Sequence, residues 1–324
     1  MFLPLTCLAA AQSFLSSLPP VSPHPEPAYR FWAEIAADVA PLVRERPGVI
    51  RPFVMGRSVE DRDIWAFEVR DPATTPTFQI LVIAQIHALE WVPAEIAASF
   101  LVESVRYPHP DVALTVVPVF NVDGRARVEA DLVEGRNLYR RGNANKVDLN
   151  RDFEIHRESD AVWRHIMPRR YTTSPSPLSQ PESRALDQLA GSRPYDAAVS
   201  LHSYGGYIYY PWAGRRERAP DWRELHTLAT AMAAAMGPQA YRPRQLSRWA
   251  FFFRGLGMEV DHLYGKYGIP SFLVETTHSG LSPLRPADWD VYFRWYNPIE
   301  PAKHIREGLR LLGGLVNAVG GLRG

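Results

Sequence analysis

The chain has 324 residues, 46% of them hydrophobic, and its 36 Lys and Arg residues nearly balance 35 Asp and Glu, for a formal net charge of +1. This balance argues against a nucleic-acid partner and against an acidic solvating tail. The single cysteine, Cys7, excludes an internal disulfide and a cysteine-rich zinc site, so any metal must be held by histidines and carboxylates.

The N-terminal segment is apolar and short. Residues 2–11 are hydrophobic and end in a pattern that resembles a signal cleavage site, but no basic region precedes them. We therefore expect these residues to form a helix or a tail rather than a leader. Together with the Pro-rich connector that follows, they would form an N-terminal segment over residues 1–27. A catalytic domain would then occupy residues 28–324. The absence of disulfides slightly favours a cytoplasmic over a secreted protein, and no run is long enough to predict a membrane span.

Beyond this segment, strand patterns alternate with helix patterns. We expect helices over residues 28–45, 92–106, 181–191, 221–236 and 300–319, and strands over residues 63–69, 78–86, 112–120, 196–202 and 270–275. The charged stretch over residues 121–160 is predicted to be irregular. The alternation predicts a single α/β domain with a mixed, mostly parallel twisted sheet and helices on both faces.

Polar side chains stand at the ends of three predicted strands. His87 and Glu90 follow one strand, His202 ends a second and Glu275 ends a third. Because ligands bind at the carboxyl ends of strands in open α/β sheets, these side chains are expected on one rim. Catalytic zinc usually takes three protein ligands and a water, and a further carboxylate can accept a proton from that water. Taken one by one, the histidines could instead be a capped turn and a core residue.

Several short segments then follow one another in a characteristic order. They are QIHALEWVPAE (85–95), NVDG (121–124), NLYRR (137–141), DLNRDF (148–153), SQPE (179–182), LHSY (201–204) and FLVE (272–275). In this order they resemble the carboxypeptidase A-like zinc metallopeptidases, and the likeness extends over about residues 55 to 315. It implies the fold of that family and hydrolysis of a C-terminal peptide bond.

The resemblance also implies a role for each matching residue. His87, Glu90 and His202 would bind one zinc per chain, and Glu275 would act as general base. Arg140 would stabilise the oxyanion, since a guanidinium suits a developing negative charge. The substrate would contact Asn150 and Arg151 through its terminal carboxylate, and also Tyr204, Phe253 and Val260.

Three positions depart from the family pattern or bear on substrate choice. Leu89 stands where the pancreatic enzymes have an arginine, and Phe253 stands where many members have a mobile tyrosine. Phe253 can exclude water but cannot donate a hydrogen bond. Val260 falls at the base of the side-chain pocket and favours an uncharged terminal side chain.

These departures leave other functions open. A zinc amidohydrolase acting on small amides or peptidoglycan-type peptides would share the metal and the base. A non-catalytic member that binds peptides would usually lack one of the four central residues, none of which is missing here. A serine hydrolase is disfavoured because the chain has no G-x-S-x-G segment. The expected partner is a peptide or small amide, and the oligomeric state is left open.

Overall fold

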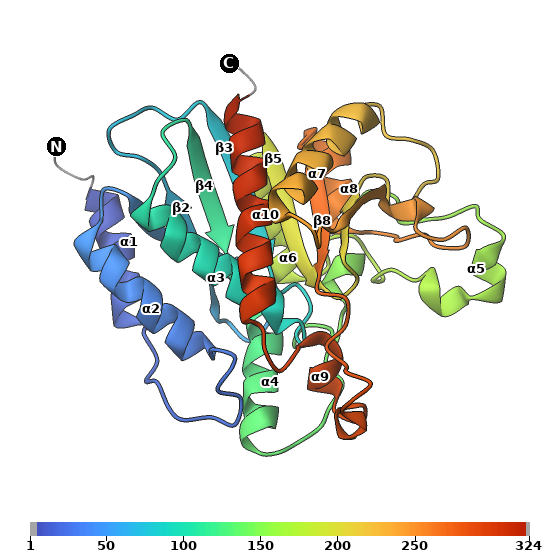
Figure 1. Ribbon diagram of the computed structural model, residues 1–324, viewed down its shortest axis with the longest axis horizontal. Helices are drawn as coiled ribbons and strands as arrows, with labels where there is room; N and C mark the ends of the chain where they lie inside the picture. The colour runs from blue at the N-terminus through green and yellow to red at the C-terminus, as the bar shows by residue number, and fades with distance from the viewer. Residues whose placement is uncertain (1–4, 322–324) are drawn as a thin grey trace.

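The structure, a computed structural model, describes residues 5–321 and is built on one eight-stranded sheet with the order β1-β2-β4-β3-β5-β8-β6-β7 (Figure 1). The strands are β1 (Ile50–Arg57), β2 (Asp63–Val69), β3 (Phe78–Ala84), β4 (Val112–Val117), β5 (Ala197–Ser203), β6 (Tyr207–Tyr210), β7 (Arg242–Gln245) and β8 (Ser271–Thr276). The four central strands are parallel, whereas β1, β2 and β6 join the sheet through antiparallel pairs. The predicted mixed, mostly parallel sheet is therefore confirmed.

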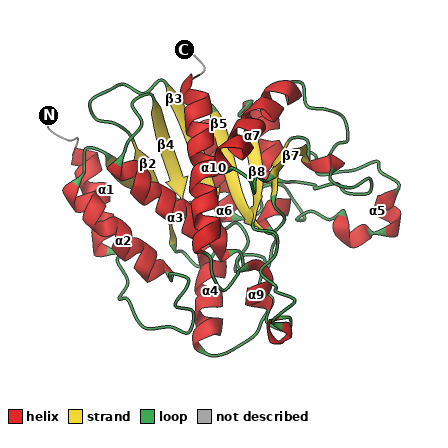
Figure 2. Ribbon diagram, in the orientation of Figure 1, coloured by secondary structure: helices red, strands yellow, loops and turns green. Residues whose placement is uncertain are grey.

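Helices cover both faces of this sheet (Figure 2). They are α1 (Leu5–Ser16), α2 (Trp32–Glu45), α3 (Trp91–Arg106), α4 (Val122–Val133), α5 (Trp163–Ile166), α6 (Pro181–Gly191), α7 (Trp222–Met236), α8 (Glu259–Tyr267), α9 (Tyr292–Tyr296) and α10 (Ala302–Gly320). Short 3-10 helices lie at η1 (Leu149–Arg151), η2 (Pro168–Arg170), η3 (Leu246–Arg248) and η4 (Pro286–Asp288). In Figure 1, α10 lies in front of the sheet beside α3 and α7.

The side chains of β3 explain why helices are needed on both faces. Ile80 and Val82 join the core cluster that contains α3, α7 and α10, whereas Leu81 and Ile83 join the cluster that contains α6 and α8. Successive strand residues point to opposite faces, so an uninterrupted apolar strand must be covered twice. This double burial fixes the strand ends, where the predicted site residues stand.

The N-terminal segment contributes to the same core. Phe14 of α1 is fully buried, with its ring centroid 5.1 Å from that of Trp65 and 5.2 Å from that of Phe67. The expected helix is therefore present, while residues 1–4 lie outside the described part of the chain, and a domain boundary at residue 27 stays a prediction. Among the described residues, no helix is long and apolar enough to cross a membrane.

Residues 121–160 contain more structure than the sequence predicts. Helix α4 begins after Asn121, whose side-chain oxygen accepts a hydrogen bond from the Gly124 amide at 2.9 Å. Asn is a strong N-cap residue, but the charged residues that follow it led us to predict an irregular segment instead of a helix. Asp131 in this helix is buried, and its arginine partners matter for the site described below.

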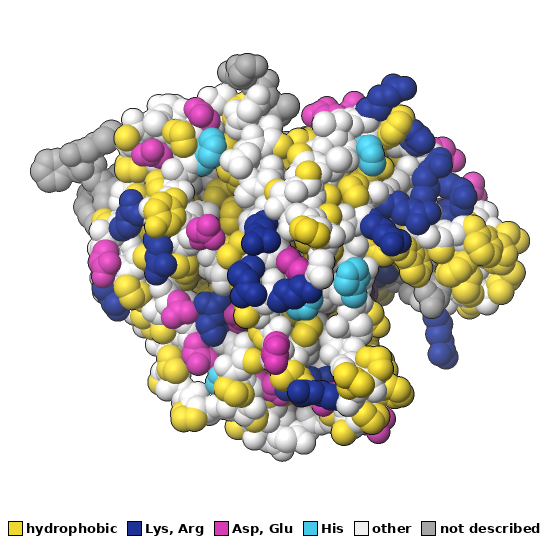
Figure 3. Space-filling view, viewed as in Figure 1, with side chains coloured by type: hydrophobic (Ala, Val, Ile, Leu, Met, Phe, Trp, Pro, Cys, Tyr) yellow, Lys and Arg dark blue, Asp and Glu magenta, His cyan; other side chains and the backbone are white. Residues whose placement is uncertain are grey.

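The segment that holds α5 projects to one side of the sheet (Figure 1). Hydrophobic side chains gather there in the space-filling view (Figure 3), and Val162, Ile166 and Phe251 are all more than half exposed. The ring centroids of Trp163 and Phe251 lie 5.0 Å apart, which ties α5 to the loop after η3. That loop also carries Trp249 and Phe253, which line the site.

Candidate active site

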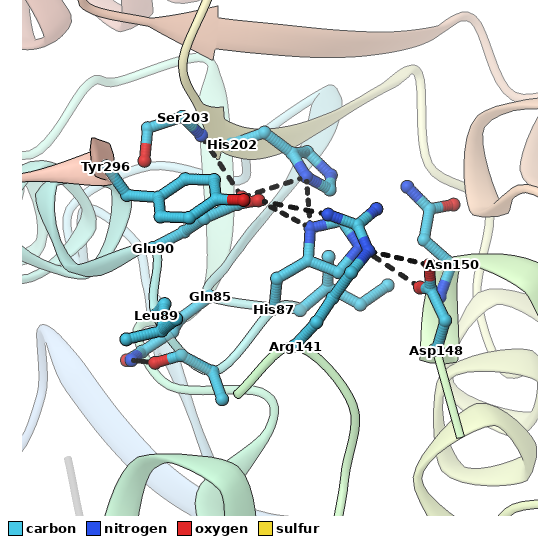
Figure 4. A network of polar contacts seen from close by, with 12 residues as sticks. Gln85, His87, Leu89, Glu90, Arg141, Asp148, Asn150, His202, Ser203 and Tyr296 are labelled. Carbon is cyan, nitrogen blue, oxygen red and sulfur yellow. Dashed lines mark hydrogen bonds and ion pairs between the residues drawn. The ribbon is translucent and has the colours of Figure 1, made fainter. Parts of the chain in front are cut away.

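Two histidines and a glutamate meet where β3 and β5 end (Figure 4). His87 Nδ1 lies 2.7 Å from Glu90 Oε1, and His202 Nδ1 lies 3.2 Å from Glu90 Oε2 and 3.3 Å from His87 Nδ1. One ligand atom from each residue lies within 4.8 Å of the others, so this group could hold a metal ion. Two imidazole nitrogens and a carboxylate are a donor set that suits zinc.

The outer nitrogen of each imidazole faces a carboxylate. His87 Nε2 lies 3.1 Å from Asp148 Oδ1, and His202 Nε2 lies 2.9 Å from Glu259 Oε1 and 3.0 Å from Ser200 Oγ. Such outer partners fix the ring orientation and leave Nδ1 to bind a metal. Glu259 was missed as a functional residue, because nothing in its local sequence indicates that α8 places it against His202.

The charges of this centre favour a bound cation. Burial by itself would raise the pKa of Glu90, but the neighbouring His87 and His202 outweigh it and hold that pKa below its ordinary value. Burial would lower the pKa of His202, yet Glu259 and Glu90 more than offset it and raise the pKa to about 10. The centre thus stabilises a positive charge in a fully buried place, and its residues fit a divalent metal such as zinc.

Glu275 stands at the end of β8, directly beside His202 in the parallel pairing of β5 and β8. It lines the same cavity, and its Oε2 is buried with no hydrogen-bond partner among the described residues. Burial, followed by the charge of Glu90, raises the pKa of Glu275 to about 8. An unpartnered carboxylate with a raised pKa is suited to accept a proton.

The two adjacent arginines point in different directions. Arg140 pairs with Asp131 of α4, with 2.9 Å between Nη2 and Oδ1, and it does not line the cavity. Arg141 does line it, with its Nε 2.8 Å from Asp148 Oδ2 and its Nη1 3.7 Å from Glu90 Oε1 (Figure 4). The structure therefore places Arg141, and not the predicted Arg140, beside the metal ligands. Two consecutive arginines look alike in the sequence, and only the buried Asp131 of the unpredicted helix separates them.

The metal ligands open into a cavity of about 490 Å³. Of the predicted substrate contacts, Asn150, Arg151, Tyr204 and Phe253 line this cavity and Val260 does not. Val260 is buried beneath the wall, where it packs in a cluster with Leu246 and Met258. The predicted pocket base is thus corrected, because α8 turns Val260 into the core.

The wall of this cavity beside Glu275 is largely apolar. Its apolar and aromatic members are Tyr207, Tyr209, Leu246, Trp249, Phe253, Met258 and Leu273. Leu89, at the position where the pancreatic enzymes have an arginine, is buried in the core and is not among the lining residues. An uncharged side chain would fit this wall, which agrees with the character predicted from Val260 but involves different residues.

Arg151 and Asn150 are held together by α8. The Asn150 side-chain oxygen accepts a hydrogen bond from the Glu259 amide at 3.2 Å, and Arg151 Nη1 donates to the Asn150 carbonyl at 2.6 Å. The Asn150 amide in turn donates to Asp148 Oδ1 at 2.9 Å. No carboxylate lies within ion-pair distance of Arg151 among the described residues, and burial lowers the pKa of its guanidinium. This cation therefore remains available to an anionic ligand.

A second acidic group lies between α6 and α8 and already holds a cation. Glu154, Asp187 and His262 come close enough to bind a metal. However, the Lys266 ammonium lies 2.6 Å from Glu154 Oε2 and 2.7 Å from Asp187 Oδ1. We therefore describe it as an ion-pair cluster.

Comparison with known proteins places this fold and centre in one family. Residues 35–295 match the family described as zinc carboxypeptidase. The chain belongs to the zinc carboxypeptidase family, as the sequence motifs predicted.

Individual relatives are distant. The chain is 25% identical to carboxypeptidase O of Bos taurus over 227 residues, which cover 64% of this chain and 59% of the relative. It is 24% identical to carboxypeptidase A6 of Mus musculus over 272 residues, which cover 78% of this chain and 62% of the relative. The alignments thus span less than two thirds of the length of these relatives.

Solved structures show the same fold. Carboxypeptidase A from Helicoverpa armigera superimposes with a TM-score of 0.72 at 18% identity, covering 98% of this chain and 81% of that one. Bovine thrombin-activatable fibrinolysis inhibitor, solved in complex with tick carboxypeptidase inhibitor, gives a TM-score of 0.69 at 21% identity, covering 90% of this chain and 97% of that one. The predicted fold class is confirmed.

Proposed function

We propose that this chain is a zinc metallocarboxypeptidase that hydrolyses the C-terminal peptide bond of peptides. The observation that carries the proposal is the content of one cavity. It holds the His87 and His202 edges of the metal centre, the unpartnered Glu275 and the unpaired guanidinium of Arg151. A hydrolytic centre and a site for a free carboxylate thus share the same space.

The reaction would use the metal centre and two further side chains around the scissile bond. Zinc held by His87, Glu90 and His202 would supply Lewis-acid polarisation of the carbonyl and of a water molecule. Glu275 accepts a proton from the attacking water and passes it to the leaving amine. Arg141, oriented by its contact with Asp148, faces the carbonyl oxygen as negative charge develops on it.

Substrate binding would use the rest of the cavity. Arg151 and Asn150 hold the terminal carboxylate, because a guanidinium fork matches a carboxylate with two parallel hydrogen bonds. The wall formed by Leu246, Met258 and Leu273 receives an apolar terminal side chain. Phe253 covers the bound residue and excludes water without donating a hydrogen bond.

A zinc amidohydrolase for small amides or peptidoglycan-type peptides is the second candidate. The feature that favours it is Phe253, which lines the cavity without a hydroxyl group for the peptide. A peptide-binding protein without activity is disfavoured, because the three metal ligands and Glu275 are all present and converge.

A substrate library tests the proposal by comparing free and amidated C-termini on otherwise identical peptides. We expect cleavage of the free-carboxylate peptides with an apolar terminal residue. Arg151→Ala should raise KM for these peptides by about two orders of magnitude, the effect of losing a charge-assisted contact to the substrate. It should change KM little for amides. Equal effects on both series, measured by initial rates, would support the amidase instead.

A further inference from the structure

A second cavity, of about 700 Å³, lies on the outer side of the first and shares Arg141, Arg151 and Phe253 with it. We refer to it as the outer groove. Lys146 and Arg169 also line it, together with the segment from Thr172 to Pro175. Because Arg141, Arg151 and Phe253 line both, the metal cavity and this groove adjoin one another.

The outer groove carries an excess of positive charge. Lys146 and Arg169 are exposed, and within the described part of the chain neither has a carboxylate at ion-pair distance. Arg151 likewise has none. The acidic residue that lines the groove, Asp148, is already engaged by Arg141 Nε at 2.8 Å and by His87 Nε2 at 3.1 Å. The groove therefore offers cations that no protein carboxylate neutralises.

Local structure fixes the backbone that carries these cations. Lys146 lies in a turn closed by two hydrogen bonds, from its own amide to the Asn143 carbonyl at 2.9 Å and from the Asn143 amide to the Val147 carbonyl at 3.0 Å. Arg169 lies in η2, and its carbonyl accepts a hydrogen bond from the Thr172 hydroxyl at 3.2 Å. The backbone at both positions is therefore ordered before a ligand binds, so that binding an anion has to order only the two side chains.

We propose that the outer groove binds a second carboxylate of an acidic peptide, supplied by a Glu or Asp side chain close to the C-terminus. This inference rests on the proposed function, since the terminal carboxylate of the same peptide is held by Arg151. A peptide is favoured over a free anion because the groove adjoins the metal cavity, with Arg151 lining both. The apolar wall still receives the terminal side chain, so the acidic residue lies upstream of it.

Binding measurements test the proposal independently of turnover. In the zinc-loaded Glu275→Gln protein, calorimetry at low salt compares acetyl-Ala-Glu-Phe with acetyl-Ala-Gln-Phe, and acetyl-Glu-Ala-Phe with acetyl-Gln-Ala-Phe. We expect the Glu peptide of at least one pair to bind about fivefold more tightly than its Gln counterpart. The effect is modest because ion pairs with the exposed Lys146 and Arg169 contribute little to the free energy of binding. The advantage should shrink as salt is added.

Two double variants locate the effect. Introducing Lys146→Gln and Arg169→Gln together into the Glu275→Gln protein should abolish the tighter binding of the Glu peptide. Adding Arg44→Gln and Arg310→Gln removes two exposed cations from α2 and α10, which do not line the groove, and should preserve it. Equal binding of the Glu and Gln peptides, no binding of any peptide, or an advantage that survives the loss of Lys146 and Arg169 would overturn the proposal. Cleavage of the Gln peptides by the protein with Glu275 intact tests the proposed function separately.

Discussion

The metal cavity and the outer groove share Arg141 and Arg151 but balance charge in opposite ways. In the buried metal cavity, imidazoles and carboxylates neutralise one another at distances near 3 Å. In the outer groove, Lys146 and Arg169 remain unmatched by carboxylates of the described chain. A buried unpaired charge is costly, whereas an exposed one is solvated at little cost. Apart from Glu275 and Arg151, the buried charges are therefore paired, and the charges left without a carboxylate partner are the exposed ones.

Glu275 and Arg151 are the exceptions in the metal cavity, and replacing Glu275 should have the largest effect. Glu275→Gln should lower kcat by about 10²- to 10⁴-fold, the usual contribution of a general base. Zinc content, measured by elemental analysis, should stay at one per chain because the three ligands are untouched. Normal turnover in this variant would remove Glu275 from its proposed role.

The adjacent arginines allow a matched test of which one serves the metal cavity. Arg141→Ala should lower kcat/KM by about 10²- to 10³-fold, as expected for the loss of an oxyanion-stabilising group. Arg140→Ala should leave kcat/KM nearly unchanged and cost about 1 kcal/mol or less of folding stability, because it removes a partly exposed ion pair with Asp131. The reverse ranking in steady-state kinetics would restore the original assignment to Arg140.

The carboxylate behind His202 can be weakened without touching a ligand. Glu259→Gln keeps the size of the side chain but removes the charge that faces His202 Nε2 at 2.9 Å. Zinc affinity, measured by competition with a chelator, should fall by about 10- to 100-fold. Glu300→Gln, a change at an exposed residue, is the control and should leave the affinity unchanged. Equal affinities in both variants would mean that Glu259 only fills space.

A separate effect concerns the stability of the metal-free protein. The pKa of Glu275 is raised from 4.5 to about 8, so between these pH values the folded protein retains a proton that the unfolded chain has released. Stability should therefore fall as pH rises through this window, by at most roughly 1.4 kcal/mol per unit.

Glu275→Gln resembles the protonated form and isolates this contribution. In denaturant titrations with chelator present, the variant should match the wild type near pH 5 and be the more stable of the two near pH 8. A constant difference across this range would show that Glu275 does not titrate there.

Sequence patterns predicted the parts of the site that sit on regular structure. His87, His202 and Glu275 were found because apolar strands end at them, and the parallel pairing of β3, β5 and β8 brings such ends together. This part of the fold follows from strand periodicity and burial on both faces.

Residues positioned by tertiary contacts were harder to predict. Arg141 could not be separated from Arg140 without the buried Asp131, and Val260 was taken for the pocket base because the rotation of α8 is invisible in the sequence. Nothing in the sequence around Glu259 indicated that its side chain would face His202. Lys146 and Arg169 lie 23 positions apart in irregular segments, so nothing in the sequence shows that they line the same groove.

Asp148 links functions that are usually considered one at a time. One of its oxygens faces His87 and accepts the Asn150 amide, while the other accepts from Arg141. A single carboxyl group thereby contacts a candidate metal ligand, the arginine proposed to stabilise the oxyanion and the residue proposed to bind the end of the peptide. A substitution of Asp148 is therefore expected to disturb all three contacts at once, whereas a substitution on the cavity wall is expected to leave them in place.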